Sequence, residues 1–262
     1  MFVIGERINP SGRLSLALAL LDGRIQVFQK EALEQERLGV DALDINIYLP
    51  RIDRVQAMRL AVQGVRCVSR LPMVVDDREA EIIRVGLECG GADIIVNTPL
   101  SSSGVDPKVI ELLHQFKTKI IFVPLKKNTP PKLVRDRIRT SRTIVKELER
   151  NGISRKRMYV DALLFPVKRA KEKIVETLTT IKGLRSELGV STVIGLSNVS
   201  YGLKHREQVN AAFLKLAKSA GLDAAILNPL QQEVMKEARA AKKISLNRSE
   251  INRFFEFTRS LK

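Results

Sequence analysis

Carboxylate and carboxamide side chains stand at the end of most of the short apolar runs in this sequence. Their positions are Asp44, Asn46, Asp76, Asn97, Asp161 and Asn198. An asparagine side chain both donates and accepts hydrogen bonds, whereas an ionised aspartate only accepts them. Together they suit a flat heterocycle with amino, ring N–H and carbonyl groups, because a carboxylate can accept paired N–H bonds from an aminopyrimidinone edge. The set therefore predicts a binding site for such a ring.

The alternative is that these residues only cap helices or form turns, which is a common role of Asp and Asn. That interpretation explains Asp77 and Asn228 well. It explains the larger set poorly, because Asp44, Asp76 and Asp161 directly follow apolar residues. We therefore favour a ligand-binding ring. Further polar residues reach the same ends: Glu6, Asn9, Thr98, Lys127, Asn128 and Ser197.

The sequence holds no pattern for nucleophilic, phosphate-binding or metal-dependent chemistry. It has no P-loop, no GxGxxG and no Ser-His-Asp grouping, and its two histidines, His114 and His205, stand apart from each other. Cys67 and Cys89 lie on segments with helical periodicity, so we expect both to be buried structural thiols. We expect no metal in the site, because neither cysteines nor histidines are clustered.

Eight short apolar runs alternate with longer stretches of helical periodicity. The expected strands are residues 2–5, 42–47, 73–76, 93–97, 120–125, 158–163, 192–196 and 224–227. Residues 28–39 and 51–70 are typical of the intervening helices, with Gly39 as a stop signal. This alternation predicts an α/β fold of the (β/α)8 TIM-barrel type, whose active sites form at the carboxyl ends of the strands. A doubly wound sheet of six strands is the alternative. Because no linker or composition break interrupts the chain, we expect one domain over residues 1–262.

The formal net charge of +16 is the unusual bulk property of the chain. Much of it lies between Lys132 and Arg185, where Leu133, Ile138, Ile144, Val145 and Leu148 recur at helical spacing among Lys and Arg. The simpler interpretation is a solvated helix face. The other is a docking surface for an acidic partner or a polyanion. Nucleic acid binding is disfavoured, because the chain has no Trp, few aromatic residues and no motif that interleaves them with basic residues.

The composition also favours a cytoplasmic protein that does not enter a membrane. No apolar run reaches the length of about 20 residues that spans a bilayer. The N-terminal run is too short for a signal peptide, and two cysteines make no disulfide framework. Near the C-terminus, residues 249–262 predict a helix with an apolar face suited to burial, formed by Phe254, Phe255 and Phe257.

Six motifs occur in the order of a known family. They are "GERIN" at 5–9, "LDIN" at 43–46, "VVD" at 74–76, "VN" at 96–97, "VDALLFP" at 160–166 and "GLSNVS" at 195–200. Over its whole length the chain resembles the pterin-binding barrel of methyltetrahydrofolate:corrinoid protein methyltransferases. That family includes the methyltetrahydrofolate:corrinoid/iron–sulfur protein enzyme and the folate domain of cobalamin-dependent methionine synthase.

The resemblance implies that the barrel binds 5-methyltetrahydrofolate and passes its methyl group to the Co(I) corrinoid (cobalamin) of a partner protein. Asp76, Asn97 and Asp161 would hydrogen-bond the pterin, with Asp44 and Asn46 beside them. Asn198 would be catalytic, because a donor at the methyl-bearing nitrogen stabilises the charge that develops as the methyl leaves. Homodimers are common in the resembling family, so a homodimer is expected.

The sequence departs from the family's usual pattern beside these motifs. Asp77 and Arg78 replace small hydroxyl residues, Tyr48 stands where glycine is typical, and Ala162 replaces a proline. Three alternative functions follow: a catalytically silent pterin-binding or docking protein, an enzyme similar to dihydropteroate synthase, and a barrel whose basic face binds nucleic acid. "GLSNVS" argues against the second, and the altered residues are the best support for the first.

Overall fold

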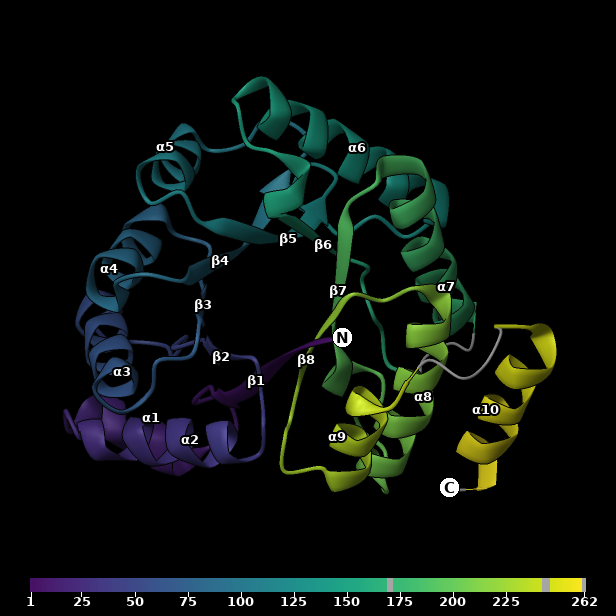
Figure 1. The fold of residues 1–262 in the computed structure, drawn as a ribbon, viewed down its shortest axis with the longest axis horizontal. Coiled ribbons are helices and arrows are strands. Elements are labelled where there is room, and N and C mark those ends of the chain that lie inside the picture. Colours follow the sequence, from purple (N-terminus) through teal and green to yellow (C-terminus); the bar gives the residue numbers. More distant parts are fainter. Residues whose placement is uncertain (169–171, 242–245, 261–262) are drawn as a thin grey trace.

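Eight parallel strands close into a barrel, and helices form a ring around it (Figure 1). The computed structural model describes residues 1–168, 172–241 and 246–260. The strands are β1 (Phe2–Ile8), β2 (Ala42–Ile45), β3 (Met73–Asp76), β4 (Ile94–Ser101), β5 (Lys119–Leu125), β6 (Met158–Asp161), β7 (Ser191–Gly195) and β8 (Ala224–Leu227). Each pairs with the next, and β8 pairs with β1. The predicted (β/α)8 TIM barrel is confirmed.

The helices follow the strands in the order expected from the sequence. They are α1 (Leu14–Leu21), α2 (Ile25–Arg37), α3 (Arg54–Val68), α4 (Ala80–Gly90), α5 (Pro107–Gln115), α6 (Val134–Arg150), α7 (Glu172–Gly183), α8 (Arg206–Ala220), α9 (Gln232–Arg239) and α10 (Arg248–Ser260). Short helical turns join some of them: a 3-10 turn at Arg155–Arg157, a π turn at Leu184–Leu188 and a 3-10 turn at Leu196–Asn198.

Several strand ends differ from the prediction in ways that shape the mouth of the barrel. Strand β2 ends at Ile45 and β6 at Asp161, each two residues earlier than expected, whereas β4 continues to Ser101 through its pairing with β5. The early end of β6 has a local cause, because Leu163 adopts a positive φ of 60° that a strand cannot accommodate. The residues after β2 and β6 are therefore free to turn over the mouth.

The interior of the barrel holds an apolar cluster that is separate from the core between sheet and helices. It contains Ile4, Ala42, Val74, Ile95, Ile121, Val193 and Ala224. Because side chains alternate along a strand, the residue two positions after each of these also faces inward, one layer nearer the carboxyl end. Those positions include Glu6, Asp44, Asp76 and Asn97. The period of the strands thus places the polar residues on top of an apolar floor.

Most of the apolar helix residues that the sequence predicted to face inward are buried. Ile138, Ile144 and Leu148 of α6 are buried, but Leu133 precedes the helix and is 49% exposed. In α10, Phe254 is buried, and its ring centroid lies 5.9 Å from that of Phe213 in α8. The predicted core role of this C-terminal helix is confirmed for Phe254.

The expectation of buried thiols was wrong for Cys67. It is exposed on α3, whereas Cys89 on α4 is half-buried, because the apolar stripe of α3 runs through Met58, Val62 and Val65 instead. Among the described residues, no helix combines the length and the apolar character needed to cross a membrane.

Candidate functional site

The carboxyl end of the barrel gathers the six predicted site residues around one mouth. Asp44 and Asn97 are buried on β2 and β4, while Asp76 and Asp161 end β3 and β6. Asn46 follows β2 directly, and Asn198 lies in the 3-10 turn that follows β7. The strands place all six as the sequence predicts, but side-chain contacts join only some of them.

Asn46 and Asp76 form a direct pair across neighbouring strands. The Asn46 Nδ2 donates to Asp76 Oδ2 at 3.0 Å, and Asn46 Oδ1 accepts from the backbone N–H of Tyr48 at 3.2 Å. Both residues line a pocket of about 280 Å³ at the mouth. Its other lining residues are Asn9, Ser11, Tyr48, Arg54, Asp77, Arg78 and Pro99. The pocket therefore opens over the β2–β4 side of the ring.

Two of the residues that depart from the family pattern, Tyr48 and Asp77, are connected on that side through Arg54. Arg54 of α3 forms ion pairs with Asp77 and Glu79, and its guanidinium carbon lies 5.5 Å from the centre of the Tyr48 ring. Asp77 Oδ1 also accepts from the backbone N–H of Glu79 at 2.9 Å. Asp77 thus has the local turn role that the sequence favoured, and Tyr48, 56% exposed, is held at the rim.

Asn228, the other residue assigned to a turn, has that role. Its Oδ1 accepts from the backbone N–H of Leu230 at 3.1 Å.

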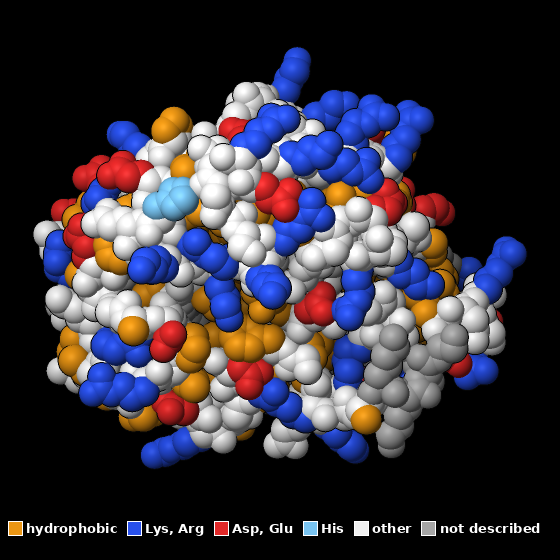
Figure 2. All heavy atoms as spheres, turned by 45° about the horizontal axis from the view of Figure 1, so that its top comes forward, with side chains coloured by type: hydrophobic (Ala, Val, Ile, Leu, Met, Phe, Trp, Pro, Cys, Tyr) orange, Lys and Arg blue, Asp and Glu red, His pale blue; other side chains and the backbone are white. Residues whose placement is uncertain are grey.

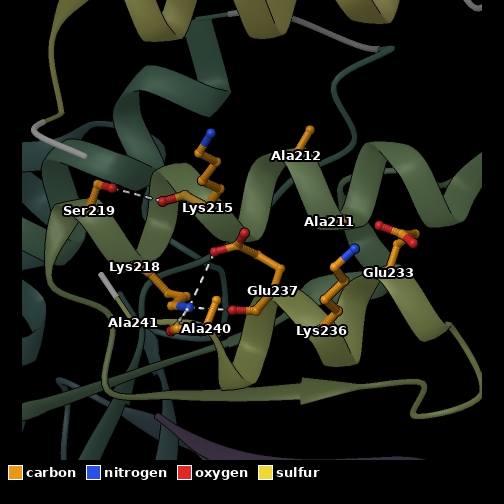
Figure 3. Close-up of a pocket in the computed structure, with 10 residues that line it drawn as sticks. All are labelled: Ala211, Ala212, Lys215, Lys218, Ser219, Glu233, Lys236, Glu237, Ala240 and Ala241. Carbon is orange, nitrogen blue, oxygen red and sulfur yellow. Dashed lines mark hydrogen bonds and ion pairs between the residues drawn. The ribbon is translucent and has the colours of Figure 1, made fainter. Parts of the chain in front are cut away.

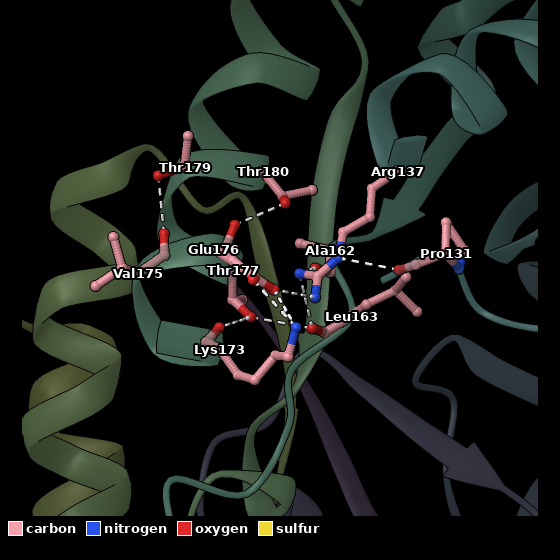
Figure 4. A network of polar contacts seen from close by, with 10 residues as sticks. All are labelled: Pro131, Arg137, Ala162, Leu163, Lys173, Val175, Glu176, Thr177, Thr179 and Thr180. Atoms are coloured by element: carbon pink, nitrogen blue, oxygen red, sulfur yellow. Dashed lines mark hydrogen bonds and ion pairs between the residues drawn. The ribbon is translucent and has the colours of Figure 1, made fainter. Parts of the chain in front are cut away.

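Asp161 is held by the loop that follows it. Its Oδ1 accepts from the backbone N–H of Leu163 at 2.7 Å, so the left-handed conformation of Leu163 serves this bond. Two carbonyl oxygens of the loop, those of Ala162 and Leu163, each lie 3.4 Å from Arg137 Nη1 (Figure 4). Arg137 belongs to α6 and is fully buried. A side chain of the outer ring therefore fixes the segment that carries an aspartate of the mouth.

The turn that carries Asn198 is fixed from two directions. The Ser197 hydroxyl donates to the carboxylate of Glu6, a half-buried residue on β1. Arg206, the first residue of α8, donates through Nη2 to the carbonyl oxygen of Ser197 at 3.0 Å and through Nε to Ser200 Oγ at 3.1 Å. Asn198 itself is exposed, and within residues 1–168, 172–241 and 246–260 its carboxamide forms no hydrogen bond with the protein. That carboxamide is free to meet a ligand.

Burial of several carboxyl groups in one mouth raises their pKa values. Burial raises the pKa of Asp76 to about 6, against the hydrogen bond from Asn46, and it raises the pKa of Asp161 to about 6, against the N–H of Leu163. Asp44 has its pKa raised well above the ordinary range by burial and by the charges of Asp76 and Glu6. Burial also raises the pKa of Glu6. A ligand that brings N–H donors would relieve this crowding of charge.

The surroundings of Asp44 Oδ1 also indicate a ligand-binding site. It is buried and has no hydrogen-bond partner among the described residues. An unpaired buried acceptor is costly, so this atom fits a site whose partner arrives with the ligand. No group of three or more His, Cys, Asp or Glu in the described part of the chain could hold a metal ion.

A second cavity lies away from the mouth, on the outside of the barrel between α8 and α9 (Figure 3). Its volume is about 380 Å³. The buried ammonium of Lys218 is already satisfied there, since it donates to Ala240 O at 2.7 Å and to Glu237 Oε1 at 3.2 Å. Because these polar atoms are paired with one another, we place the functional site at the mouth.

Comparison with known proteins shows the family to which the chain belongs. Residues 17–228 match the family described as pterin binding enzyme. The chain belongs to this family. The match includes "GLSNVS", whereas "GERIN" precedes it. The resemblance inferred from the sequence is thereby confirmed.

Curated relatives of this pterin-binding protein carry methyl-transfer names. The methionine synthase of Mycobacterium leprae is 26% identical over 87% of this chain, and that of Mycobacterium tuberculosis is 25% identical over the same share. The chain spans only about 20% of the length of either. The methylcorrinoid:tetrahydrofolate methyltransferase of Eubacterium limosum is 21% identical over 90% of this chain and 88% of its own length.

A solved structure supports the fold of this pterin-binding protein. The dihydropteroate synthase of Xanthomonas albilineans in complex with 7,8-dihydropteroate superposes with a TM-score of 0.69, covering 90% of each chain at 18% identity. At that identity the likeness concerns the barrel alone.

Proposed function

We propose that the protein transfers the methyl group of 5-methyltetrahydrofolate to the Co(I) corrinoid of a partner protein, with Asn198 assisting at the methyl-bearing nitrogen. The observation that carries this proposal is the exposed carboxamide of Asn198, which bonds to none of the described residues and lies on a turn held by Ser197 and Arg206 beside the carboxyl groups of the mouth. The full-length similarity to a methylcorrinoid:tetrahydrofolate methyltransferase supports the same reaction class.

The residues of the mouth match the hydrogen-bonding groups of a pterin. Ionised Asp76 and Asp161 accept N–H bonds from the amino and ring nitrogens, and Asn97 both donates and accepts. Asp44 lies beside them, with its pKa raised well above the ordinary range by burial and by the charges of Asp76 and Glu6. The orphaned Oδ1 of Asp44 would gain a partner when the pterin binds. Asn46, already bonded to Asp76, orients that carboxylate.

Asn198 acts on the developing charge of the departing nitrogen. Its carboxamide N–H is preorganised by the fixed turn, so little reorganisation is needed when charge builds up there. The corrinoid supplies the nucleophile when its carrier docks, and for this reason the chain itself needs no nucleophilic side chain. An exposed Asn198 is compatible with a second macromolecule that must reach the methyl group.

Binding of 5-methyltetrahydrofolate should weaken in acid. The N–H donors of the pterin require ionised Asp76 and Asp161, whose pKa values lie at about 6 in the free protein. Below that pH each protonated carboxyl must release a proton on binding, so Kd should rise about tenfold per pH unit for each group and stay nearly flat between pH 7 and 8. Titration calorimetry from pH 5 to 8 measures this. Asp161→Asn should reduce by one proton the slope of log Kd against pH in the acid range. A Kd that is constant down to pH 5 would contradict the assignment.

The proposed reaction can be tested with the purified protein, 5-methyltetrahydrofolate and free Co(I) cobalamin under anaerobic conditions. Loss of the Co(I) absorbance with formation of methylcobalamin is the expected result. The reverse reaction, from methylcobalamin to tetrahydrofolate, should be assayed in parallel, since the similar enzyme of Eubacterium limosum is named for that direction. Folate binding without methyl transfer in either direction would favour the alternative of a catalytically silent pterin-binding protein. The observation that supports this alternative is the contact between Tyr48 and Arg54 at the edge of the mouth.

A further inference from the structure

Charge is distributed unevenly around the mouth of the barrel. In the part of the chain that the structure describes, the loops after β5, β6 and β7 contain basic residues and no acidic ones over residues 126–133, 162–168 and 196–205. The loops after β2, β3 and β4 are different, because they include Asp53, Asp77, Glu79 and Asp106. Among the described residues, the loops on the β5–β7 half of the mouth therefore carry only basic charges, and those on the β2–β4 half carry charges of both signs.

We call the lysines of this half the basic rim. Its members are Lys126, Lys127, Lys132, Lys168 and Lys204. All five are exposed, and none of them forms an ion pair within the described ranges 1–168, 172–241 and 246–260. Exposed lysines elsewhere, such as Lys119 and Lys156, also form no ion pair with a described residue, so the basic rim is distinguished by the lack of acidic residues in the described parts of its loops. Figure 2 shows one face of the molecule as a whole, on which Lys and Arg side chains predominate over Asp and Glu.

The backbone beneath the basic rim is fixed. Ser101 Oγ donates to the carbonyl oxygen of Lys127 at 2.6 Å, and Lys168 Nζ lies 3.4 Å from the carbonyl oxygen of Gly202, which joins the β6 and β7 loops. The loop before Lys168 is held by buried Arg137. Five unpaired cations on an ordered backbone repel one another, and an anionic ligand that spans the loops would remove that repulsion.

The basic rim adjoins the half of the site assigned to the reacting nitrogen. Asp161 precedes the middle loop, and Asn198 lies in the last one. A folate seated with its pterin over these residues carries its glutamate carboxylates away from the floor of the barrel. Neighbouring parallel strands are about 4.8 Å apart, so the loops of three adjacent strands offer a row of cations to a chain that leaves the mouth.

We propose that the basic rim binds the oligo-γ-glutamyl tail of the folate, so that the polyglutamylated form is the preferred substrate. This rests on the proposed function. Each added glutamate brings one carboxylate, and tethering to the bound pterin makes every later contact intramolecular. Each exposed ion pair contributes little by itself, but several together should tighten binding by about tenfold at low ionic strength. Added salt should reduce that gain.

The test compares the monoglutamate and pentaglutamate forms of 5-methyltetrahydrofolate by titration. A rim variant carries Lys126→Glu, Lys168→Glu and Lys204→Glu. A control variant with the same net charge carries Lys119→Glu, Lys156→Glu and Lys182→Glu, three exposed lysines toward the amino ends of the strands. We expect the pentaglutamate to bind the wild-type and control proteins about tenfold more tightly than the monoglutamate. In the rim variant the two forms should bind equally, with monoglutamate affinity retained.

The outcomes separate this inference from the proposed function. Failure of wild-type protein to bind either form would overturn the pterin site itself and the tail site with it. Monoglutamate binding with no gain from added glutamates would overturn only the tail site and would leave the basic rim to an acidic protein surface. The tail site would also be overturned if the rim variant still bound the pentaglutamate more tightly than the monoglutamate. The same conclusion would follow if the control variant lost that preference as fully as the rim variant.

Discussion

Replacing Asn198 with alanine should slow methyl transfer by about 10²–10³, the effect of losing one preorganised transition-state hydrogen-bond donor. Folate affinity should change by no more than about twofold, because our proposal assigns the pterin contacts mainly to Asp44, Asp76, Asn97 and Asp161. The fold should be unaffected, since the Asn198 side chain is exposed and bonds to no described residue. Single-turnover kinetics with Co(I) cobalamin and a folate titration measure the two effects separately.

Asn128 provides a matched control for this substitution. It is another exposed asparagine near the mouth, in the loop after β5, and the proposal gives it no part in the reaction. Asn128→Ala should therefore transfer methyl groups at the wild-type rate. A slow Asn198→Ala protein with unchanged folate affinity would support the catalytic role. If Asn198→Ala turned over at the wild-type rate, the catalytic role would be excluded. If it lost folate affinity as much as it lost rate, Asn198 would instead contribute to binding of the folate in the ground state.

The barrel and the position of its mouth could be predicted because both depend on the local periodicity of apolar and polar residues along the sequence. Alternation along the strands places Asp44 and Asp76 on the same inner face as Ala42 and Val74, and the short apolar runs fix the strand order. The strand ends were less predictable. Where β6 ends depends on the positive φ of Leu163, a residue type that seldom adopts it.

Contacts made by closure of the barrel could not be predicted. Glu6 was recognised as a polar residue at a strand end, but its bond to Ser197 joins positions 191 residues apart and exists only because β1 and β7 flank β8. Arg54 was likewise not connected with Tyr48 or Asp77, which belong to different loops. Pair contacts of this kind depend on tertiary geometry, for which one sequence without relatives holds no signal.

Arg137 did leave a signal in the sequence. It lies on the stripe of α6 that contains Ser141, Ile144 and Leu148, all of which are buried, so its charge interrupts a face that packs inward. A basic residue at such a position needs buried partners. Those partners are carbonyl groups of irregular loops and a glutamate 39 residues away, which helical periodicity does not reveal.

Replacing Arg137 with methionine should lower the free energy of unfolding by about 1–3 kcal/mol, the usual cost of leaving buried hydrogen-bond acceptors without a partner. The guanidinium lies 3.1 Å from Glu176 Oε2 and 3.3 Å from the carbonyl oxygen of Pro131, and its carbon is 5.3 Å from the centre of the Phe165 ring. Methionine fills the space but satisfies none of the oxygens. Denaturant unfolding measures the loss. Arg139→Met, at an exposed position of the same helix, should change the stability by about 0.5 kcal/mol or less.

The same substitution should also alter the mouth, and this distinguishes Arg137 from a residue that only stabilises the fold. The charge of Arg137 lowers the pKa of Asp161, so its removal should raise that pKa further and move the onset of acid-weakened folate binding above pH 6. Arg137→Lys keeps the charge but cannot reach every carbonyl oxygen, so it should restore the pH profile more fully than the stability. A destabilised Arg137→Met protein with an unshifted pH profile would mean that the arginine supports the loop without tuning the aspartate.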